Sequence, residues 1–309
     1  MIRHQQLILL LFVAVAVITA SFPTTANGQP IRIDSRLVVV PVTVLDRDGR
    51  HVTALTKIDF RVFENGVEQA IDIFEPVENE LNVYLLIDVS GSVAKFSNEI
   101  ADAASTFVKQ LRPNDEVSVA SFAYGRRVLV DGTKVSSFPD RIKIQLFPLD
   151  PGTLIYEAVD FASERLGKRR GRKAIVLFSD GVDTGIHKDL KRALRDAAEQ
   201  DAAIYTIHYG AKEPPTKFVD PQKHLAWQKN AHTYMRTVAE GTGGRYFKIE
   251  EIVDLPGTFR QIADELSRQY TLGYYPQKDG KKGERRTIKV TVDRPYLAVR
   301  SRTGYVLDR

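Results

Sequence analysis

Three oxygen-bearing side chains that follow an apolar run are the residues here best suited to chemistry. Asp88, Ser90 and Ser92 come directly after the apolar residues 83–87, and Gly91 lets the chain turn sharply between the two serines. Their alternate spacing allows all three side chains to point into one small volume. Such an oxygen set suits a hard cation such as Mg²⁺ or Ca²⁺, whereas Zn²⁺ prefers nitrogen and sulfur ligands.

Two further stretches carry residues of the same kind. Asp180 and Gly181 follow a second apolar run at residues 174–178, and Thr153 follows Gly152 at the start of a predicted helix. The ends of neighbouring parallel strands share one edge of a doubly wound sheet, so the loops of Asp88 and Asp180 are expected to face each other there. A helix N-cap is the alternative, purely structural role for Thr153.

The elements that position these residues follow from the hydrophobic pattern between residues 81 and 268. Apolar runs alternate with segments of helical period, which predicts an α/β fold: a doubly wound, mostly parallel sheet with helices on both faces, similar to Rossmann-type sheets. Three prolines in residues 212–230 predict a long surface loop, followed by a helix over residues 233–240.

Both flanks of this α/β region, residues 29–80 and 269–309, have the pattern of β-strands. Asn65 and Gly66 between two strand-like runs predict a tight hairpin. Each flank is too short to bury a core alone, because chains below about 40–60 residues are marginally stable. We therefore expect the two flanks to pair into one small β-sandwich into which the predicted domain of residues 81–268 is inserted.

Residues 1–28 have the features of a secretory signal peptide. A basic start, a short apolar run and small residues precede a predicted cleavage site before Gln29. An uncleaved membrane anchor is the alternative, although the run is short of the roughly 20 residues that span a bilayer. The sequence contains no cysteine, which excludes disulfides and thiolate metal sites. These features predict a secreted or periplasmic protein with no stable membrane span after cleavage.

The charge pattern does not favour a nucleic-acid partner. The formal net charge is only +5, and the basic runs at residues 168–173 and 281–286 contain no aromatic residues. Both runs are expected to be solvated turns, with a polyanion-binding patch as the alternative.

Taken together, the motifs resemble the von Willebrand factor type A (VWA) domain. That family's five-residue metal-ion-dependent adhesion site (MIDAS) is present in order as Asp88, Ser90, Ser92, Thr153 and Asp180. The resemblance implies that the two serines and the threonine are direct or near-direct metal ligands, and that the two aspartates often act through water. Mg²⁺ is the expected cation, and Mn²⁺ and Ca²⁺ also suit the ligands.

The flanking strands, with their motifs at residues 270–276 and 302–305, resemble a group of exported bacterial VWA proteins of acidobacterial type. Glu157 is a small departure, because related sequences often have Asp there. The resemblance implies a non-enzymatic, adhesion-type module that binds an Asp or Glu carboxylate of a partner protein through the cation.

Two other functions compete with this one. The chain could be a structural envelope protein with a vestigial metal site, or a hydrolase that uses the cation as a Lewis acid. The sequence lacks a Gly-x-Ser-x-Gly elbow, a His-Glu-x-x-His motif and a phosphate-binding loop, so it offers the hydrolase no support.

Overall fold

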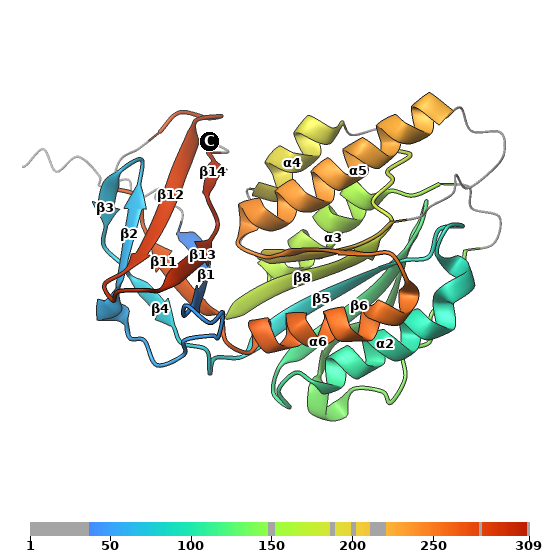
Figure 1. Ribbon diagram of the computed structural model, residues 1–309, viewed down its shortest axis with the longest axis horizontal. Coiled ribbons are helices and arrows are strands. Elements are labelled where there is room, and N and C mark those ends of the chain that lie inside the picture. The colour runs from blue at the N-terminus through green and yellow to red at the C-terminus, as the bar shows by residue number, and fades with distance from the viewer. Residues whose placement is uncertain are drawn as a thin grey trace, which may run out of the picture. The chain divides into compact units, whose positions relative to one another are not determined.

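The computed structural model describes residues 37–147, 152–185, 189–198, 202–210, 221–277 and 280–307. The predicted signal peptide lies outside these residues. Within them, the chain forms one α/β region and two small antiparallel sheets (Figure 1). The described residues include no helix that is both long and apolar enough to cross a bilayer.

A six-stranded sheet forms the centre of the α/β region, in the order β10-β9-β8-β5-β6-β7. All neighbouring strands are parallel except β7, which is antiparallel to β6. The expected doubly wound, mostly parallel sheet is therefore confirmed. The strands are β5 (Leu81–Asp88), β6 (Glu116–Phe122), β7 (Arg126–Lys134), β8 (Arg172–Ser179), β9 (Ala203–Tyr209) and β10 (Tyr246–Ile249).

Helices cover both faces of this sheet (Figure 1), and the side chains of β5 alternate between them. Val83 and Leu85 belong to the core beneath α2 and α6, whereas Tyr84 and Leu86 belong to the core beneath α3, α4 and α5. This is why residues 83–87 of β5 are all apolar. The helices are α2 (Ser97–Lys109), α3 (Ile155–Gly167), α4 (Leu190–Ala198), α5 (Pro221–Thr242) and α6 (Leu255–Leu266).

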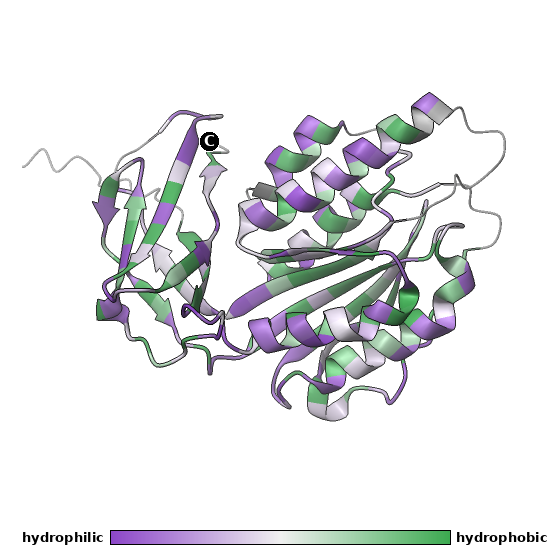
Figure 2. Cartoon of the chain, viewed as in Figure 1, coloured by the Kyte–Doolittle hydropathy of each residue, from purple (hydrophilic) through white to green (hydrophobic). Residues whose placement is uncertain are grey.

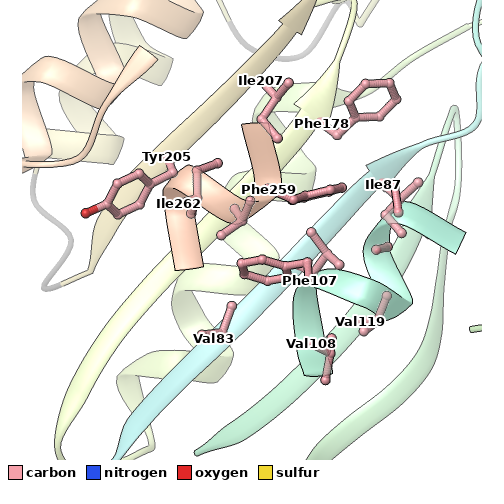
Figure 3. Packing of buried hydrophobic residues seen from close by; sticks show 14 of the residues in the cluster. Val83, Ile87, Phe107, Val108, Val119, Phe178, Tyr205, Ile207, Phe259 and Ile262 are labelled. Carbon is pink, nitrogen blue, oxygen red and sulfur yellow. The ribbon is translucent and has the colours of Figure 1, made fainter. Parts of the chain in front are cut away.

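The core beneath α2 and α6 is built around aromatic rings. Phe107 of α2 and Phe259 of α6 have ring centroids 5.1 Å apart and lie over the central strands (Figure 3). The central strands are hydrophobic along much of their length, whereas the helices alternate between hydrophobic and hydrophilic residues (Figure 2). Burial of these apolar faces fixes the sheet, and with it the positions of the loops at its edge.

The expected loop over residues 212–230 is wrong in its second half. Helix α5 begins at Pro221 and runs to Thr242, so residues 221–230 are helical. Proline fits the first position of a helix, because the amide hydrogen that it lacks would have no partner there. Residues 211–220 lie outside the described part of the chain.

Strands from both flanks of the chain form the two antiparallel sheets, as predicted. One sheet has the order β13-β1-β11-β4 and the other β14-β12-β2-β3. Val40 of β1 is opposite Leu272 of β11, and Val62 of β2 is opposite Val290 of β12. All four side chains lie in one buried cluster that both sheets share. The strands are β1 (Val38–Leu45), β2 (Phe60–Glu64), β3 (Val67–Gln69), β4 (Ile73–Glu75), β11 (Tyr270–Tyr274), β12 (Arg285–Val292), β13 (Ala298–Ser301) and β14 (Gly304–Val306).

Short 3-10 turns complete the described elements, and the predicted hairpin is present. Asn65 and Gly66 both have positive φ, of 47° and 82°, as a two-residue turn between β2 and β3 requires. The 3-10 turns are η1 (Lys57–Asp59), η2 (Ala94–Phe96), η3 (Val135–Ser137) and η4 (Ile252–Asp254).

The expectation that both basic runs are solvated turns is wrong for one arginine in each. Arg172 is buried and donates a hydrogen bond to the main-chain oxygen of Val77 at 2.7 Å. Arg286 is also buried and pairs with the buried carboxylate of Glu64 at 2.6 Å. These two guanidinium groups stabilise the fold and do not contribute to a surface for polyanions.

Candidate metal centre

The carboxyl ends of β5 and β8 bring the two predicted aspartates together. The strands are parallel neighbours, with Ile87 opposite Phe178 in register, and Figure 3 shows both side chains in the core just before the strands end. Asp88 is the last residue of β5, and Asp180 comes directly after β8. The chain continues from β5 to β6 on one side and reaches β8 on the other, so this edge is the switch point of the sheet.

Four of the five predicted side chains form a continuous hydrogen-bonded group. The Ser92 hydroxyl donates to Oδ2 of Asp180 at 2.6 Å and lies 3.3 Å from the Ser90 hydroxyl oxygen. The main-chain amide of Ser90 donates to Oδ1 of Asp88 at 2.8 Å. The spacing of alternate oxygen side chains after β5 therefore places them in one small volume, as the sequence pattern predicts.

Thr153 is held by Thr184 through its main chain. Its amide donates to the Thr184 hydroxyl at 2.8 Å, and its carbonyl accepts from the Thr184 amide at 2.9 Å. Among the described residues, no hydrogen bond joins the Thr153 hydroxyl to the other four predicted side chains. Leu154, not Thr153, is the N-cap of α3, and it makes no side-chain cap. The alternative role of Thr153 as a helix cap is therefore wrong.

Burial makes the negative charge of this group costly. Asp88 is fully buried, and that burial, together with the nearby charge of Asp180, raises the pKa of the Asp88 carboxyl to about 7. In the described part of the chain, no Lys or Arg forms an ion pair with Asp88. A divalent cation would supply positive charge where two carboxylates converge, and the surrounding oxygens are the donors that Mg²⁺ and Ca²⁺ prefer. The residues therefore fit such a cation.

The group depends on hydroxyl oxygens as well as on carboxylates. The described residues include no cluster of three or more His, Cys, Asp or Glu side chains that could hold a metal. Two carboxylates with two serine hydroxyls form a weaker set of donors, which would leave a bound cation electrophilic and partly hydrated.

Sequence reasoning missed three supporting residues. Ser179 donates to Oδ2 of Asp88 at 2.5 Å and accepts from the Gly181 amide at 2.9 Å. Asp183 accepts from the amide of Tyr156, the second residue of α3, at 3.2 Å. Thr184 clamps Thr153, as described above. Ser179 could have been found, because it is the last residue of β8 and stands beside Asp180. The other two act through contacts that no short-range pattern reveals.

His208 is close to the site but already has hydrogen-bond partners. Its Nδ1 lies 2.9 Å from the Tyr246 hydroxyl, and its ring also hydrogen-bonds to the main chain of Asp180. Burial lowers the pKa of His208 to about 4, so its imidazole is neutral near pH 7. His187, which the sequence places near the same loops, lies outside the described residues.

Comparison with known proteins identifies the family of the chain. The family model of the von Willebrand factor type A domain matches residues 82–261. The chain belongs to this family. The match starts in β5 and ends in α6, so it includes the VWA region that carries all five predicted site residues. VWA domains are generally protein-interaction modules, and they commonly bind a divalent cation at a MIDAS. No curated protein matches the chain.

Solved structures with similar folds have low sequence identity to this VWA protein. A von Willebrand factor type A protein from Catenulispora acidiphila is 12% identical, with 90% of this chain and 76% of that chain covered and a TM-score of 0.45. The ArnB paralog VWA2 from Sulfolobus acidocaldarius is 14% identical, with 87% and 76% covered and a TM-score of 0.46. Proximal thread matrix protein 1 from the mussel byssus, described with a zinc-occupied MIDAS motif, is 13% identical, with 67% and 50% covered and a TM-score of 0.47.

Proposed function

We propose that this VWA protein is an exported, adhesion-type module that binds a divalent cation and, through it, a carboxylate of a partner protein. The proposed metal residues are Asp88, Ser90, Ser92, Thr153 and Asp180, and Mg²⁺ is the proposed cation, with Mn²⁺ and Ca²⁺ also suited to the ligands. The proposal depends above all on one observation. Side chains from the loops after β5 and β8 converge, with the Ser92 hydroxyl donating to the Asp180 carboxylate at 2.6 Å.

Neighbouring groups hold both carboxylates of the site in place. Ser179 and the Ser90 amide hold the Asp88 carboxylate from both sides at 2.5 and 2.8 Å, which fixes its orientation before any cation arrives. Asp180 is held by the Val182 amide at 3.0 Å. A cation bound there would supply an electrophile with a water-filled position that an Asp or Glu side chain can enter. Preformed ligands lower the ordering cost of binding, as in other preorganised sites.

Calorimetry with Mg²⁺, Mn²⁺ and Ca²⁺ tests the cation. We expect the wild type to bind at least one of them and Asp88→Ala to bind none. Asp140→Ala is the matched control, because its side chain is fully exposed and only weakly paired with Lys109, at 3.9 Å. Equal heats in all three proteins would show that the cation does not bind at the proposed site.

The relaxation rate of water protons tests whether the bound cation recognises a carboxylate. Bound Mn²⁺ speeds the relaxation of water protons, and a ligand that displaces its water reduces this effect. N-acetyl-aspartate amide should reduce it, whereas N-acetyl-asparagine amide should not. If neither compound has an effect on protein that holds Mn²⁺, carboxylate recognition is wrong. If the protein turns over ester or phosphate reporters and Asp180→Ala abolishes that turnover, the result would instead favour the hydrolase. If the protein binds the cation but no carboxylate ligand, the result would favour the structural alternative.

A further inference from the structure

The turn between β6 and β7 places an exposed aromatic side chain beside the candidate metal centre. Tyr124 in this turn is 58% exposed, although the residues before it, up to Ala123, are buried. The Ala123 carbonyl accepts a hydrogen bond from the Leu154 amide at 2.9 Å. A Cβ atom on Gly152 would lie only 3.2 Å from Cδ2 of Tyr124. The tyrosine ring is therefore a direct neighbour of the loop that carries Thr153.

Two arginines follow Tyr124 at the start of β7, and their side chains lie on opposite faces of the sheet because successive strand residues alternate. The guanidinium carbon of Arg126 lies 5.0 Å from the centre of the Phe161 ring, and that of Arg127 lies 5.1 Å from the centre of the Phe147 ring. Arg127 also donates to the side-chain oxygen of Gln145 at 2.8 Å. No carboxylate of the described residues forms an ion pair with either arginine. Their charges are thus held in place by aromatic rings and an amide, and they stay available to an anion.

We propose that Tyr124 and Arg127 form a second contact surface, called here the Tyr124 turn, and that it selects the partner of the cation site. Arg127 belongs to this surface because its guanidinium lies over the Phe147 ring, and a Cβ on Gly125 of the turn would lie 3.3 Å from that ring. The inference rests on the proposed function. The partner that fits is a protein segment with an Asp or Glu for the cation, an aromatic side chain next to it, and a second acidic residue within reach of Arg127.

Charge and chemistry support this occupant. A divalent cation would offset the charges of the two aspartates, and Arg127, which has no carboxylate partner among the described residues, adds a positive charge beside them, so an acidic segment is favoured over a basic one. An exposed tyrosine offers a large, rigid contact area at a small cost in side-chain entropy, and tyrosine and arginine are enriched among the residues that dominate binding energy. The carboxylate would supply attachment, and the Tyr124 turn would supply discrimination between acidic partners.

Four immobilised peptides test the inference with the full chain in 1 mM Mn²⁺. They present the sequences Asp-Phe-Glu, Asp-Gly-Glu, Asp-Phe-Gln and Asn-Phe-Gln between glycine spacers. We expect wild type to bind Asp-Phe-Glu about tenfold more tightly than Asp-Gly-Glu, and Tyr124→Ala to lose that preference. Arg127→Gln should lose the preference for Asp-Phe-Glu over Asp-Phe-Gln. Tyr275→Ala, which removes an exposed tyrosine of the sandwich flank, should keep both preferences.

Calorimetry with Mn²⁺ on the same variants separates the two proposals. Tyr124→Ala and Arg127→Gln should bind Mn²⁺ as wild type does, which also shows that they are folded. If wild type binds Mn²⁺ but binds the four peptides equally or not at all, the Tyr124 turn does not select partners and the inference is overturned, while the cation site stands. The same holds if Asp-Phe-Glu binding persists in chelator or in Asp88→Ala. If wild type binds no cation, the proposed function fails and the inference fails with it.

Discussion

Gly152→Ala probes whether the two loops of the candidate site are packed as tightly as the structure indicates. The new Cβ would lie 2.7 Å from the Thr184 hydroxyl oxygen, which is closer than real Cβ contacts occur. That hydroxyl cannot simply rotate away, because it accepts from the Thr153 amide at 2.8 Å. The loops must therefore move apart or lose this hydrogen bond.

The expected cost has two parts. Overpacking in a rigid site costs about 1–3 kcal/mol, and a lost buried hydrogen bond costs about 1 kcal/mol. We expect Gly152→Ala to lower the free energy of unfolding by about 2–3 kcal/mol. Because the displaced loop carries Thr153, we also expect Mn²⁺ affinity to fall by at least about tenfold, or about 1.4 kcal/mol.

A double-mutant cycle isolates the contact. Thr184→Ala alone should cost about 1 kcal/mol, since it removes the hydrogen bond. In Gly152→Ala/Thr184→Ala the clash is gone, so the double variant should be more stable than the sum of the single effects predicts, by about 1 kcal/mol or more. Urea unfolding followed by the fluorescence of the single tryptophan, Trp227 in α5, measures stability, and calorimetry measures Mn²⁺ affinity.

Gly167→Ala is the matched control, because a Cβ there has no atom within 4 Å at the end of α3. It should leave stability and Mn²⁺ affinity nearly unchanged. Two results would refute the reasoning: a Gly152→Ala protein within about 0.5 kcal/mol of wild type, or strictly additive effects in the cycle.

Three other changes have defined outcomes. Glu64→Gln removes the carboxylate that pairs with the buried Arg286 at 2.6 Å. Urea unfolding should show a free energy of unfolding lower by about 3 kcal/mol. A loss below about 1 kcal/mol would contradict the role of this pair. Gly244→Ala would bring a Cβ within 2.1 Å of a main-chain oxygen of β9. It should lower the free energy of unfolding by about 3 kcal/mol, whereas Gly257→Ala, which has open space around its Cβ, should change it by almost nothing. Similar thermal midpoints for the two variants would contradict this clash. Mg²⁺ at about 100 times its dissociation constant should stabilise wild type by about 2.7 kcal/mol and leave Asp88→Ala unchanged, so an equal thermal shift in both would show binding elsewhere.

The sequence predicted the parts of the site that depend on strand ends. Asp88 follows an apolar run because β5 is buried on both faces, and the same holds for the run before Asp180. Local hydrophobicity therefore locates both strand ends, and the rules of doubly wound sheets bring those ends together. That reasoning needs no information about distant contacts, which is why it succeeded here.

The sequence could not predict the contacts between loops. Thr184 is an ordinary turn residue by composition, and its hold on Thr153 exists only once β8 and α3 are in place. Tyr124 and its exposure depend in the same way on the packing of Gly152. The start of α5 was missed for a different reason: Pro221 marks loops and helix starts equally well, and nothing before it resolves the ambiguity.

Two arginines, the half-buried Arg112 and the buried Arg172, explain how the VWA region can sit between the two flanks that build the sandwich, as we propose for residues 81–268. Arg112 donates to the main-chain oxygens of Val77, before β5, and of Ser267, after α6. Arg172 donates to the Val77 oxygen as well and to that of Leu266. A buried guanidinium that lost these carbonyls would be left with unsatisfied donors, which is costly. Each arginine therefore ties the turn before β5, where the chain enters the VWA region, to the end of α6, where the chain leaves it. The segments where the chain enters and leaves the VWA region are thus held together at one place, so strands from both ends of the chain can form one sandwich.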